Sequence, residues 1–461
     1  MSNETKRVPR QRVCSGPMPR REFLRAGALA CGGLGLAPLL GAQAAASTRP
    51  DTSVILLYLH GGPSQLETYD LKPDAPIEYR SVFTPIPTCV PGMEICELFP
   101  LQAKLADKFS LIRSLHHDVG IHSDGGIVVL TGKRPTVLDP TSTSKSEHPD
   151  FGSVTSRLRG IDERGVAPYV AVPRSLYMTR PAYLGLHHAA FTVGDPSAAE
   201  FRPPGLTLTQ PARAASWDDR HALLAGLDRL KRTFDTDQRL AANDAFREQA
   251  VRMLTSDSTT RAFDLSREDD RLRDRYGRHT WGQGCLLARR LAEAGVSVIS
   301  LYIDTPRSGP EFTNWDDHIG NAGRPGHFAG YMKTRLPYLD QCLSALIEDI
   351  FDRGLDRQIL VVVMGEFGRT PRLSQNATGV GRDHWPQAYT ALVSGGGLRM
   401  GQVVGATNSK AEYPTGRPCT PQDLLATIYR HLGIDTTRAF VDFSGRPVPI
   451  LASGAPIPEL V

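Results

Sequence analysis

Cysteine is scarce in this 461-residue chain, which contains seven, and aromatic residues make up only 7% of it. Five cysteines lie beyond residue 46, an odd number without a Cys-x-x-Cys pair, so neither a disulfide scaffold nor a thiolate metal site is indicated. Cys89 and Cys96 could close a small loop or remain two isolated thiols. Beyond residue 46, no apolar run is long enough to cross a bilayer, so we expect no transmembrane segment in the mature chain.

The chain also lacks a marked excess of charge. Its formal net charge is +4, but residues 1–46 contain seven Lys or Arg and only two acidic residues, which leaves 46 basic against 47 acidic residues in the remainder. A near-neutral chain gives no electrostatic reason to expect a nucleic-acid partner. The hydrophobic content of 40% and charged content of 22% are typical of a globular protein that can bury a large core.

The N-terminus has the pattern of a twin-arginine signal peptide. Arg20 and Arg21 stand in the segment Pro-Arg-Arg-Glu-Phe-Leu-Arg, and a Gly- and Ala-rich apolar stretch with small residues follows. We expect residues 1–46 to be removed and residues 47–461 to be exported by the twin-arginine machinery. The mature protein would then be periplasmic or extracellular.

Two alternatives remain open at this end of the chain. Translation could start at Met1 or at Met18, which directly precedes the arginine segment. A basic tail before a short buried helix is the alternative to a signal peptide.

Short apolar runs rich in β-branched residues predict a parallel sheet. The clearest is Ile-Leu-Val-Val-Val-Met at 359–364, which is typical of a central strand that is buried on both faces. Further runs predict strands at 54–59, 109–113, 168–172, 296–303 and 389–393. Helices are expected at 98–109, from residue 122, over 336–353 with Gly354 after its end, and over 421–431. This alternation of strands and helices predicts crossover connections between parallel strands.

A change in composition sets residues 211–293 apart. The segment is rich in Arg and Asp, and it has leucines at helical spacing. It predicts a helical insertion that covers the sheet, with its charged residues on a solvated face.

Polar residues follow the predicted strands at the end where α/β sheets bind ligands. These residues include His60, Asp304, Asp317, His318, Glu366 and His384. His122 and Ser123 open a predicted helix, whose N-terminus would suit an anion or a nucleophile. Surface turns, helix caps and packed histidines are the alternatives for each residue taken alone.

Three motifs resemble the bacterial domain-of-unknown-function 1501 family, whose fold is grouped with the alkaline phosphatase superfamily. They are Gly61-Gly62-Pro63-Ser64-Gln65 with Asp70 and Pro73, Gly365-Glu366-Phe367-Gly368-Arg369-Thr370-Pro371, and Gly381-Arg382-Asp383-His384. The resemblance covers nearly the whole chain after Pro50. It implies a three-layer, alkaline-phosphatase-like α/β fold with a central, mostly parallel sheet.

The resemblance also implies a divalent metal, Zn, Ca or Mn, held by carboxylates and histidines. The candidate ligands that it implies are His60, Asp304, Asp317, His318, Glu366 and His384. His60 takes the place of the superfamily's first aspartate ligand, Glu366 keeps a carboxylate, and His384 matches the last histidine. Asp304 together with Asp316-Asp317-His318 is a loose counterpart of the Asp-x3-His pattern. The catalytic candidates are Ser123 as the nucleophile, its neighbour His122, and Arg369 as a clamp for a tetrahedral anion or as an ion-pair partner of Glu366.

Together these features predict an exported, metal-dependent hydrolase of phosphate or sulfate esters, acting on a small molecule or a glycan. The alternative is a non-catalytic binding protein on a degenerate scaffold of the same kind. The loss of the first aspartate, and of a clear Thr or Cys nucleophile, favours that alternative.

Overall fold

The computed structural model describes residues 51–161, 166–201, 257–309, 311–320 and 326–461. The expected signal peptide and residues 211–256 of the expected insertion lie outside these ranges, so both remain predictions. Residues 51–461 form one compact unit. No helix in the described ranges is both long and apolar enough to serve as a membrane span.

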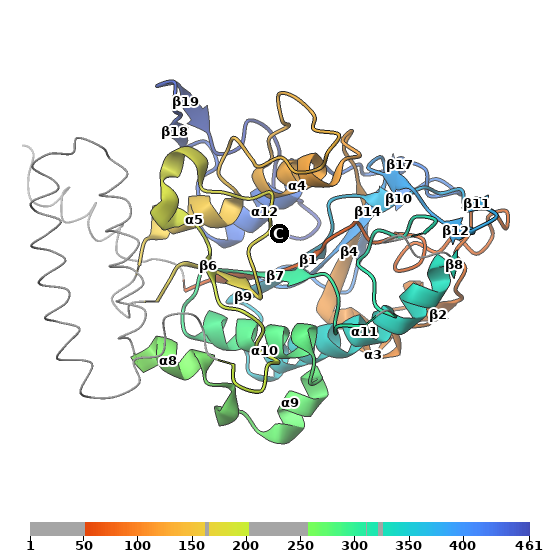
Figure 1. Cartoon of the computed structure of the whole chain (residues 1–461), viewed down its shortest axis with the longest axis horizontal. Helices are drawn as coiled ribbons and strands as arrows, with labels where there is room; N and C mark the ends of the chain where they lie inside the picture. Colours follow the sequence, from red (N-terminus) through yellow and green to blue (C-terminus); the bar gives the residue numbers. More distant parts are fainter. Residues whose placement is uncertain (1–50, 162–165, 202–256, 310, 321–325) are drawn as a thin grey trace, which may run out of the picture. The chain divides into compact units, whose positions relative to one another are not determined.

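An eight-stranded sheet forms the middle layer, in the order β15-β4-β14-β9-β1-β7-β5-β6 (Figure 1). The strands are β1 (Ser53–Leu59), β4 (Phe109–Leu115), β5 (Tyr169–Val172), β6 (Phe191–Thr192), β7 (Val298–Ile303), β9 (Ile359–Met364), β14 (Tyr389–Gly395) and β15 (Val403–Val404). Only β14 runs against its neighbours β9 and β4, and the other pairings are parallel. The predicted mostly parallel sheet is confirmed.

The central strands are apolar along their whole length because helices cover both faces of the sheet. Every residue of β1, β7 and β9 is buried. In the register of the sheet, Ile55 of β1 lies opposite Ile299 of β7 and Val361 of β9. The prediction of a central strand at 359–364 is therefore confirmed.

Helices pack on the two faces of the sheet and complete a three-layer α/β fold (Figure 1). One face carries α3 (Pro100–Ala103), α8 (Asp257–Phe263), α9 (Asp270–Tyr276), α10 (Thr280–Glu293) and α11 (Phe328–Asp352), and the other carries α4 (His122–Thr131), α5 (Phe151–Arg159) and α12 (Pro421–His431). Each face has its own hydrophobic cluster. The predicted fold class is confirmed.

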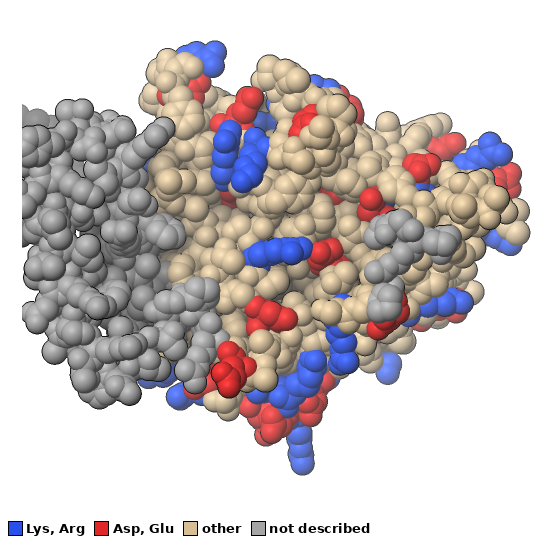
Figure 2. Space-filling view, in the orientation of Figure 1, with Lys and Arg blue, Asp and Glu red and all other residues tan. Residues whose placement is uncertain are grey.

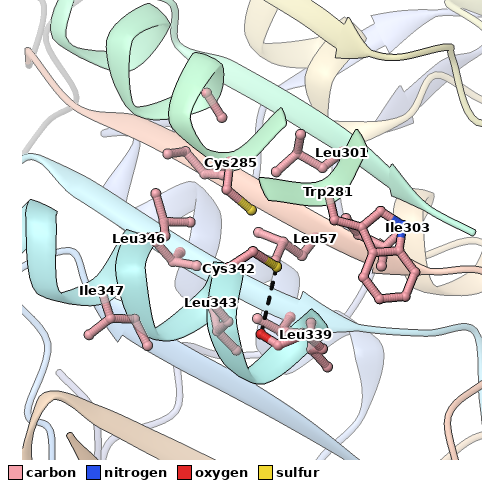
Figure 3. Packing of buried hydrophobic residues seen from close by; sticks show 14 of the residues in the cluster. Leu57, Trp281, Cys285, Leu301, Ile303, Leu339, Cys342, Leu343, Leu346 and Ile347 are labelled. Carbon is pink, nitrogen blue, oxygen red and sulfur yellow. Dashed lines mark hydrogen bonds between the residues drawn. The ribbon is translucent and has the colours of Figure 1, made fainter. Parts of the chain in front are cut away.

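The core between α10, α11 and the sheet is closely packed (Figure 3). Leu339 and Leu343 of α11 pack with Leu57 of β1, and Cys285 of α10 lies near Cys342 of α11. The five described cysteines are free thiols, and Cys89 is the exposed one.

Short elements make up the rest of the described fold. The remaining strands are β2 (Pro85–Pro87), β3 (Glu94–Cys96), β8 (Gly326–His327), β10 (Gly368–Arg369), β11 (Ser374–Asn376), β12 (Gly379–Gly381), β13 (His384–Trp385), β16 (Ala406–Thr407), β17 (Pro414–Gly416), β18 (Ala439–Val441) and β19 (Pro447–Pro449), and the 3-10 helices are η1 (Ala106–Lys108), η2 (Ala182–Leu184), η3 (Leu186–His188) and η4 (Leu265–Arg267). The predicted helix at 98–109 is wrong as a continuous element, because α3 and η1 occupy its place and Phe109 already belongs to β4.

Basic and acidic side chains are interspersed over the face shown in Figure 2. The densest group lies over α9 and contains both signs, including the ion pairs of Arg278 with Asp270 and Asp274. The near balance of charge in the sequence is thus reproduced locally on this surface.

Candidate metal centre

Four side chains converge at the carboxyl edge of the sheet. His122, Asp316, His318 and His384 each place one ligand atom within 4.8 Å of the others. The Nε2 atoms of the three histidines lie 3.3, 3.0 and 3.1 Å from Oδ1 of Asp316, in chain order. Nε2 of His318 and Nε2 of His384 are 2.8 Å apart. Three imidazole nitrogens and one carboxylate oxygen facing a common point are a donor set that suits a divalent metal, zinc above all.

Three separate segments bring these side chains together. His122 is the first residue of α4, Asp316 and His318 lie in the loop between β7 and α11, and His384 belongs to β13. β13 pairs with β10, so that His384 lies opposite Arg369.

The loop that carries Asp316 is held against the end of β1. Trp315 is fully buried, and its Nε1 donates to the carbonyl oxygen of Ile303 at 2.9 Å. Gly61 has φ of +114°, and a Cβ on it would come within 2.5 Å of the backbone nitrogen of Asp316. The glycine is therefore required both by its backbone conformation and by the close approach of this loop.

Each histidine of the group is oriented through its second ring nitrogen. An oxygen atom lies within hydrogen-bond distance of every Nδ1, so each Nδ1 can donate to it and leave Nε2 directed at the centre, where a metal ion can take the place of a proton on Nε2. The acceptors are Oε1 of Glu366 for His122 at 2.6 Å, Oδ1 of Asp383 for His318 at 2.9 Å, and the carbonyl oxygen of Gly120 for His384 at 2.7 Å. Metal-binding histidines commonly have such partners, which fix the ring and its tautomer.

The carboxylates of the centre are ionised at neutral pH. Burial raises the pKa of Glu366, but the hydrogen bond with His122 and the nearby histidine charges outweigh it and bring that pKa to about 2. Burial likewise opposes ionisation of Asp316, whereas hydrogen bonds with the three histidines hold its pKa far below the usual range. Burial lowers the pKa of His122, but the hydrogen bonds with Asp316 and Glu366 outweigh burial and raise it to about 9. A cation entering the centre would displace this proton.

His60 and Glu366, both expected as metal ligands, lie beside the four-residue group. The ring of His60 is 5.7 Å from the ring of His122, and its Nδ1 is 3.8 Å from Oε1 of Glu366. Nδ1 of His60 and Oε2 of Glu366 are buried without a hydrogen-bond partner in the described structure. Buried polar atoms are normally paired, so these two atoms are available to a ligand of the centre.

Two expected ligands are engaged elsewhere. Asp317 is fully buried and binds Arg335, which is also fully buried. Asp304 accepts a hydrogen bond from Arg174 at 2.8 Å. The structure brings neither carboxylate into the four-residue group, which contains Asp316 in its place.

Arg369, the expected anion clamp, is fully buried. Its guanidinium donates to the carbonyl oxygens of Gly61, Gly62 and Arg382 and to Oδ1 of Asp316, the last at 2.6 Å. These bonds connect the loop after β1 to the loop that carries Asp316. Arg369 therefore helps to hold Asp316 in place and is not exposed as an anion clamp.

Ser123, the expected nucleophile, is also fully buried. Its Oγ lies 3.4 Å from Oδ2 of Asp124, and its backbone nitrogen donates to Oγ of Ser142 at 3.1 Å. At this helix N-terminus it is His122 that reaches the centre.

Alternation along the loop could have identified Asp316. In an extended segment, residues i and i+2 point to the same side, so a side that carries His318 also carries Asp316, and Asp317 points the other way. In the sequence alone, Asp316 is distinguished only as part of the loose counterpart of the Asp-x3-His pattern.

Comparison with known proteins identifies a family for this sequence, and the description of that family names no activity. A family described as "Protein of unknown function (DUF1501)" matches residues 51–461. No curated relative matches the sequence.

Several solved structures are similar to this chain. The lipoteichoic acid synthase LtaP from Listeria monocytogenes is 11% identical, with a TM-score of 0.35 and coverage of 84% of this chain and 73% of that one. The PsFucS1 sulfatase from Pseudoalteromonas sp. is 12% identical, with a TM-score of 0.37 and coverage of 91% and 72%. The phosphonate monoester hydrolase SpPMH from Silicibacter pomeroyi is 12% identical, with a TM-score of 0.34 and coverage of 88% and 77%. TM-scores this low do not bear on the function of this chain.

Proposed function

The chain belongs to the DUF1501 family, and from its metal centre we propose that it is an exported, metal-dependent hydrolase of phosphate or sulfate esters. The substrate would be a small molecule or a glycan. The observation that carries the proposal is the convergence of three oriented Nε2 atoms on Oδ1 of Asp316. This donor set suits zinc best and also admits manganese, whereas calcium prefers a shell of oxygen atoms.

A divalent cation held here would supply Lewis-acid chemistry, which lowers the pKa of water and offsets the negative charge of an ester group. The protein groups around it have separate tasks. Glu366 keeps His122 in the tautomer that faces the centre. His60, with its unpaired Nδ1 next to Glu366, is placed to accept a proton from a nucleophile. Export rests on the twin-arginine pattern of residues 1–46.

One observation favours the second candidate, a non-catalytic metal- or ligand-binding protein. The Ser123 hydroxyl is buried and lies against Asp124, so it is not presented at the centre as a nucleophile. Hydrolysis would then depend on water, and a protein that holds the metal without activating water would be a binding protein.

The first experiment measures metal content. Metal-free protein is incubated with one of Zn, Mn or Ca, desalted and analysed by inductively coupled plasma mass spectrometry. We expect about one equivalent of zinc in the parent protein and a loss of most of it in His384→Ala, because a ligand is removed. His148→Ala is the matched control, since this histidine contacts Tyr183 and lies outside the group. Less than about one tenth of an equivalent of every metal would contradict a metal centre.

The second experiment measures turnover of p-nitrophenyl phosphate, p-nitrophenyl sulfate and bis-p-nitrophenyl phosphate by the zinc-loaded protein. We expect release of nitrophenol that disappears in His384→Ala and persists in His148→Ala. Ser123→Ala should also retain turnover, because its hydroxyl is buried away from the centre. Loss of turnover in a folded, zinc-loaded Ser123→Ala variant would instead support Ser123 as the nucleophile. Zinc binding without cleavage of any ester would favour the binding protein.

A further inference from the structure

Four parallel strands end next to one another along the edge that holds the metal centre. They lie in the order β9, β1, β7 and β5. The residues at or just after their ends are Glu366, His60, Asp304 and Arg174, in that order. The metal centre occupies the side of β9 and β1, so β7 and β5 continue the same edge away from it.

Aromatic contacts connect the metal centre to this second half of the edge. Tyr302, near the end of β7, lies in register with Tyr58 of β1, and His60 follows two residues later on the same side of the sheet. The ring of His60 is 5.2 Å from the ring of Tyr302 and 5.4 Å from that of Tyr177. His60 thus lies between the metal centre and a wall of two tyrosines.

Arg174 lies over the outer end of this wall. Its guanidinium carbon is 4.4 Å from the centre of the Tyr302 ring, in a cation–π contact. The side chain is 59% exposed, in contrast to the fully buried Arg369. A guanidinium that contacts the face of an aromatic ring can still use its N–H donors to bind a ligand.

The donors of Arg174 are only partly used. Among the described residues, its one hydrogen-bond partner is Oδ2 of Asp304, which accepts from one terminal nitrogen at 2.8 Å. Asp304 itself is 30% exposed. A guanidinium has five N–H donors and binds carboxylate, sulfate and phosphate groups through two of them at once. Asp304 therefore acts as an internal anion that a ligand could replace.

We propose that Arg174 and Tyr302 form a second anion subsite, which binds a phosphate, sulfate or carboxylate group of the substrate. The inference rests on the proposed function, because it adds a specificity site to the same substrate-binding edge. The guanidinium carbon of Arg174 lies 4.4 Å from the centre of the Tyr302 ring, which is itself 5.2 Å from the ring of His60. The subsite therefore lies within roughly 10 Å of His60, about two strand spacings. The substrate would carry a second anionic group on the far side of His60 from the ester that is cleaved at the metal centre.

The test uses the full mature chain in its metal-free and zinc-loaded forms. Binding of inorganic phosphate, sulfate and acetate is measured separately by isothermal titration calorimetry at constant ionic strength. In the metal-free form, Arg174→Gln should weaken binding of the preferred anion about tenfold, because a charge-assisted, bidentate contact is lost. Asp304→Asn should strengthen it severalfold, because the internal competitor is removed. Comparing the three anions identifies the class of group that the subsite accepts.

A matched control and a metal measurement complete the test. Arg417→Gln removes another half-exposed arginine that forms an ion pair at 2.7 Å with Glu459, and it should leave anion binding unchanged. Zinc content should be the same in Asp304→Asn as in the parent protein, whereas a lower content would make Asp304 a metal ligand and overturn its role as internal anion.

Equal anion affinity in Arg174→Gln and the parent, or weaker binding in Asp304→Asn, would overturn the subsite. The two proposals fail separately. If anion binding depends on Arg174 but no ester is cleaved, the subsite is supported and the hydrolase proposal is wrong. If cleavage depends on the metal but Arg174→Gln does not change anion binding, the hydrolase proposal is supported and the subsite is wrong.

Discussion

Replacing Asp316 or Asp317 with asparagine should separate metal binding from stability, although the two residues are neighbours in the chain. Asp316 presents Oδ1 to three histidines at the metal centre. Asp317 points into the core and binds Arg335. We therefore expect Asp316→Asn to lose metal and remain folded, and Asp317→Asn to keep metal and lose stability.

The stability loss of Asp317→Asn can be worked from burial. Both partners of the Asp317–Arg335 pair have 0% exposed side chains, and removing one charge from a buried pair costs about 3–5 kcal/mol. Arg335 keeps its hydrogen bonds to Oγ1 of Thr313 and to the carbonyl oxygen of Asn314, so the loss is of charge rather than of the whole contact. With an unfolding entropy of about 2.1 cal/mol/K per residue, a chain of this size should melt about 4–6 °C lower.

The assay combines differential scanning calorimetry with zinc competition against a chelator. Asp316→Asn should weaken zinc binding by more than about 100-fold, beyond the effect of losing a partner that only orients a ligand. Asp317→Asn should bind one equivalent of zinc with little change in affinity, at a temperature well below its melting transition. A folded Asp317→Asn variant that has lost zinc, together with an Asp316→Asn variant that retains it, would refute the assignment of the ligand to Asp316.

Three further outcomes are expected. Asp383→Asn should weaken zinc binding about 10- to 100-fold, because Asp383 fixes the ring of His318 through Nδ1; unchanged affinity in the chelator assay would show that this ring needs no such support. Compared with protein in zinc at 100 times Kd, the zinc-free protein should have a free energy of unfolding about 2.7 kcal/mol lower and a melting temperature about 3 °C lower. Calorimetry with and without a chelator measures the difference, and an unchanged melting temperature would contradict the prediction. The protein should lose stability below about pH 6.5, because burial lowers the pKa of His188 to about 3 and that of His279 to about 4. As the pH falls from 6.5 towards these values, the unfolded chain binds protons that the folded chain does not. Urea midpoints at pH 7.5 and 5 test this, and His188→Gln, which replaces a histidine that contacts Oγ of Ser156, should show a smaller pH dependence than the parent protein.

Local patterns were sufficient for the main elements of the fold. The run at 359–364 became β9, buried on both faces, because an unbroken β-branched segment has no polar group to expose. Thr420 caps α12 with Asp423 in a capping box, and α11 ends before Gly354, whose φ is +67°. These features depend on residues that are close together in the sequence, so they could be predicted from the sequence alone.

The strand-end rule also indicated the correct region for the site, since His318 and His384 meet at the carboxyl edge of the sheet. The rule could not say which neighbour in a loop or at a helix start would face the centre. His122 reaches it while Ser123 is buried, and Asp316 reaches it while Asp317 binds Arg335.

The sequence by itself determined the six longer strands of the sheet, the helices α4, α11 and α12, and the edge at which polar residues collect, because hydrophobic periodicity and capping act over a few residues. Only the tertiary structure decided the direction of each polar side chain. That direction depends on partners far away in the chain: Arg369 is occupied by the carbonyl oxygens of Gly61 and Gly62, about 300 residues before it. A buried guanidinium has to satisfy its donors where acceptors exist, and their positions are known only once the chain has folded.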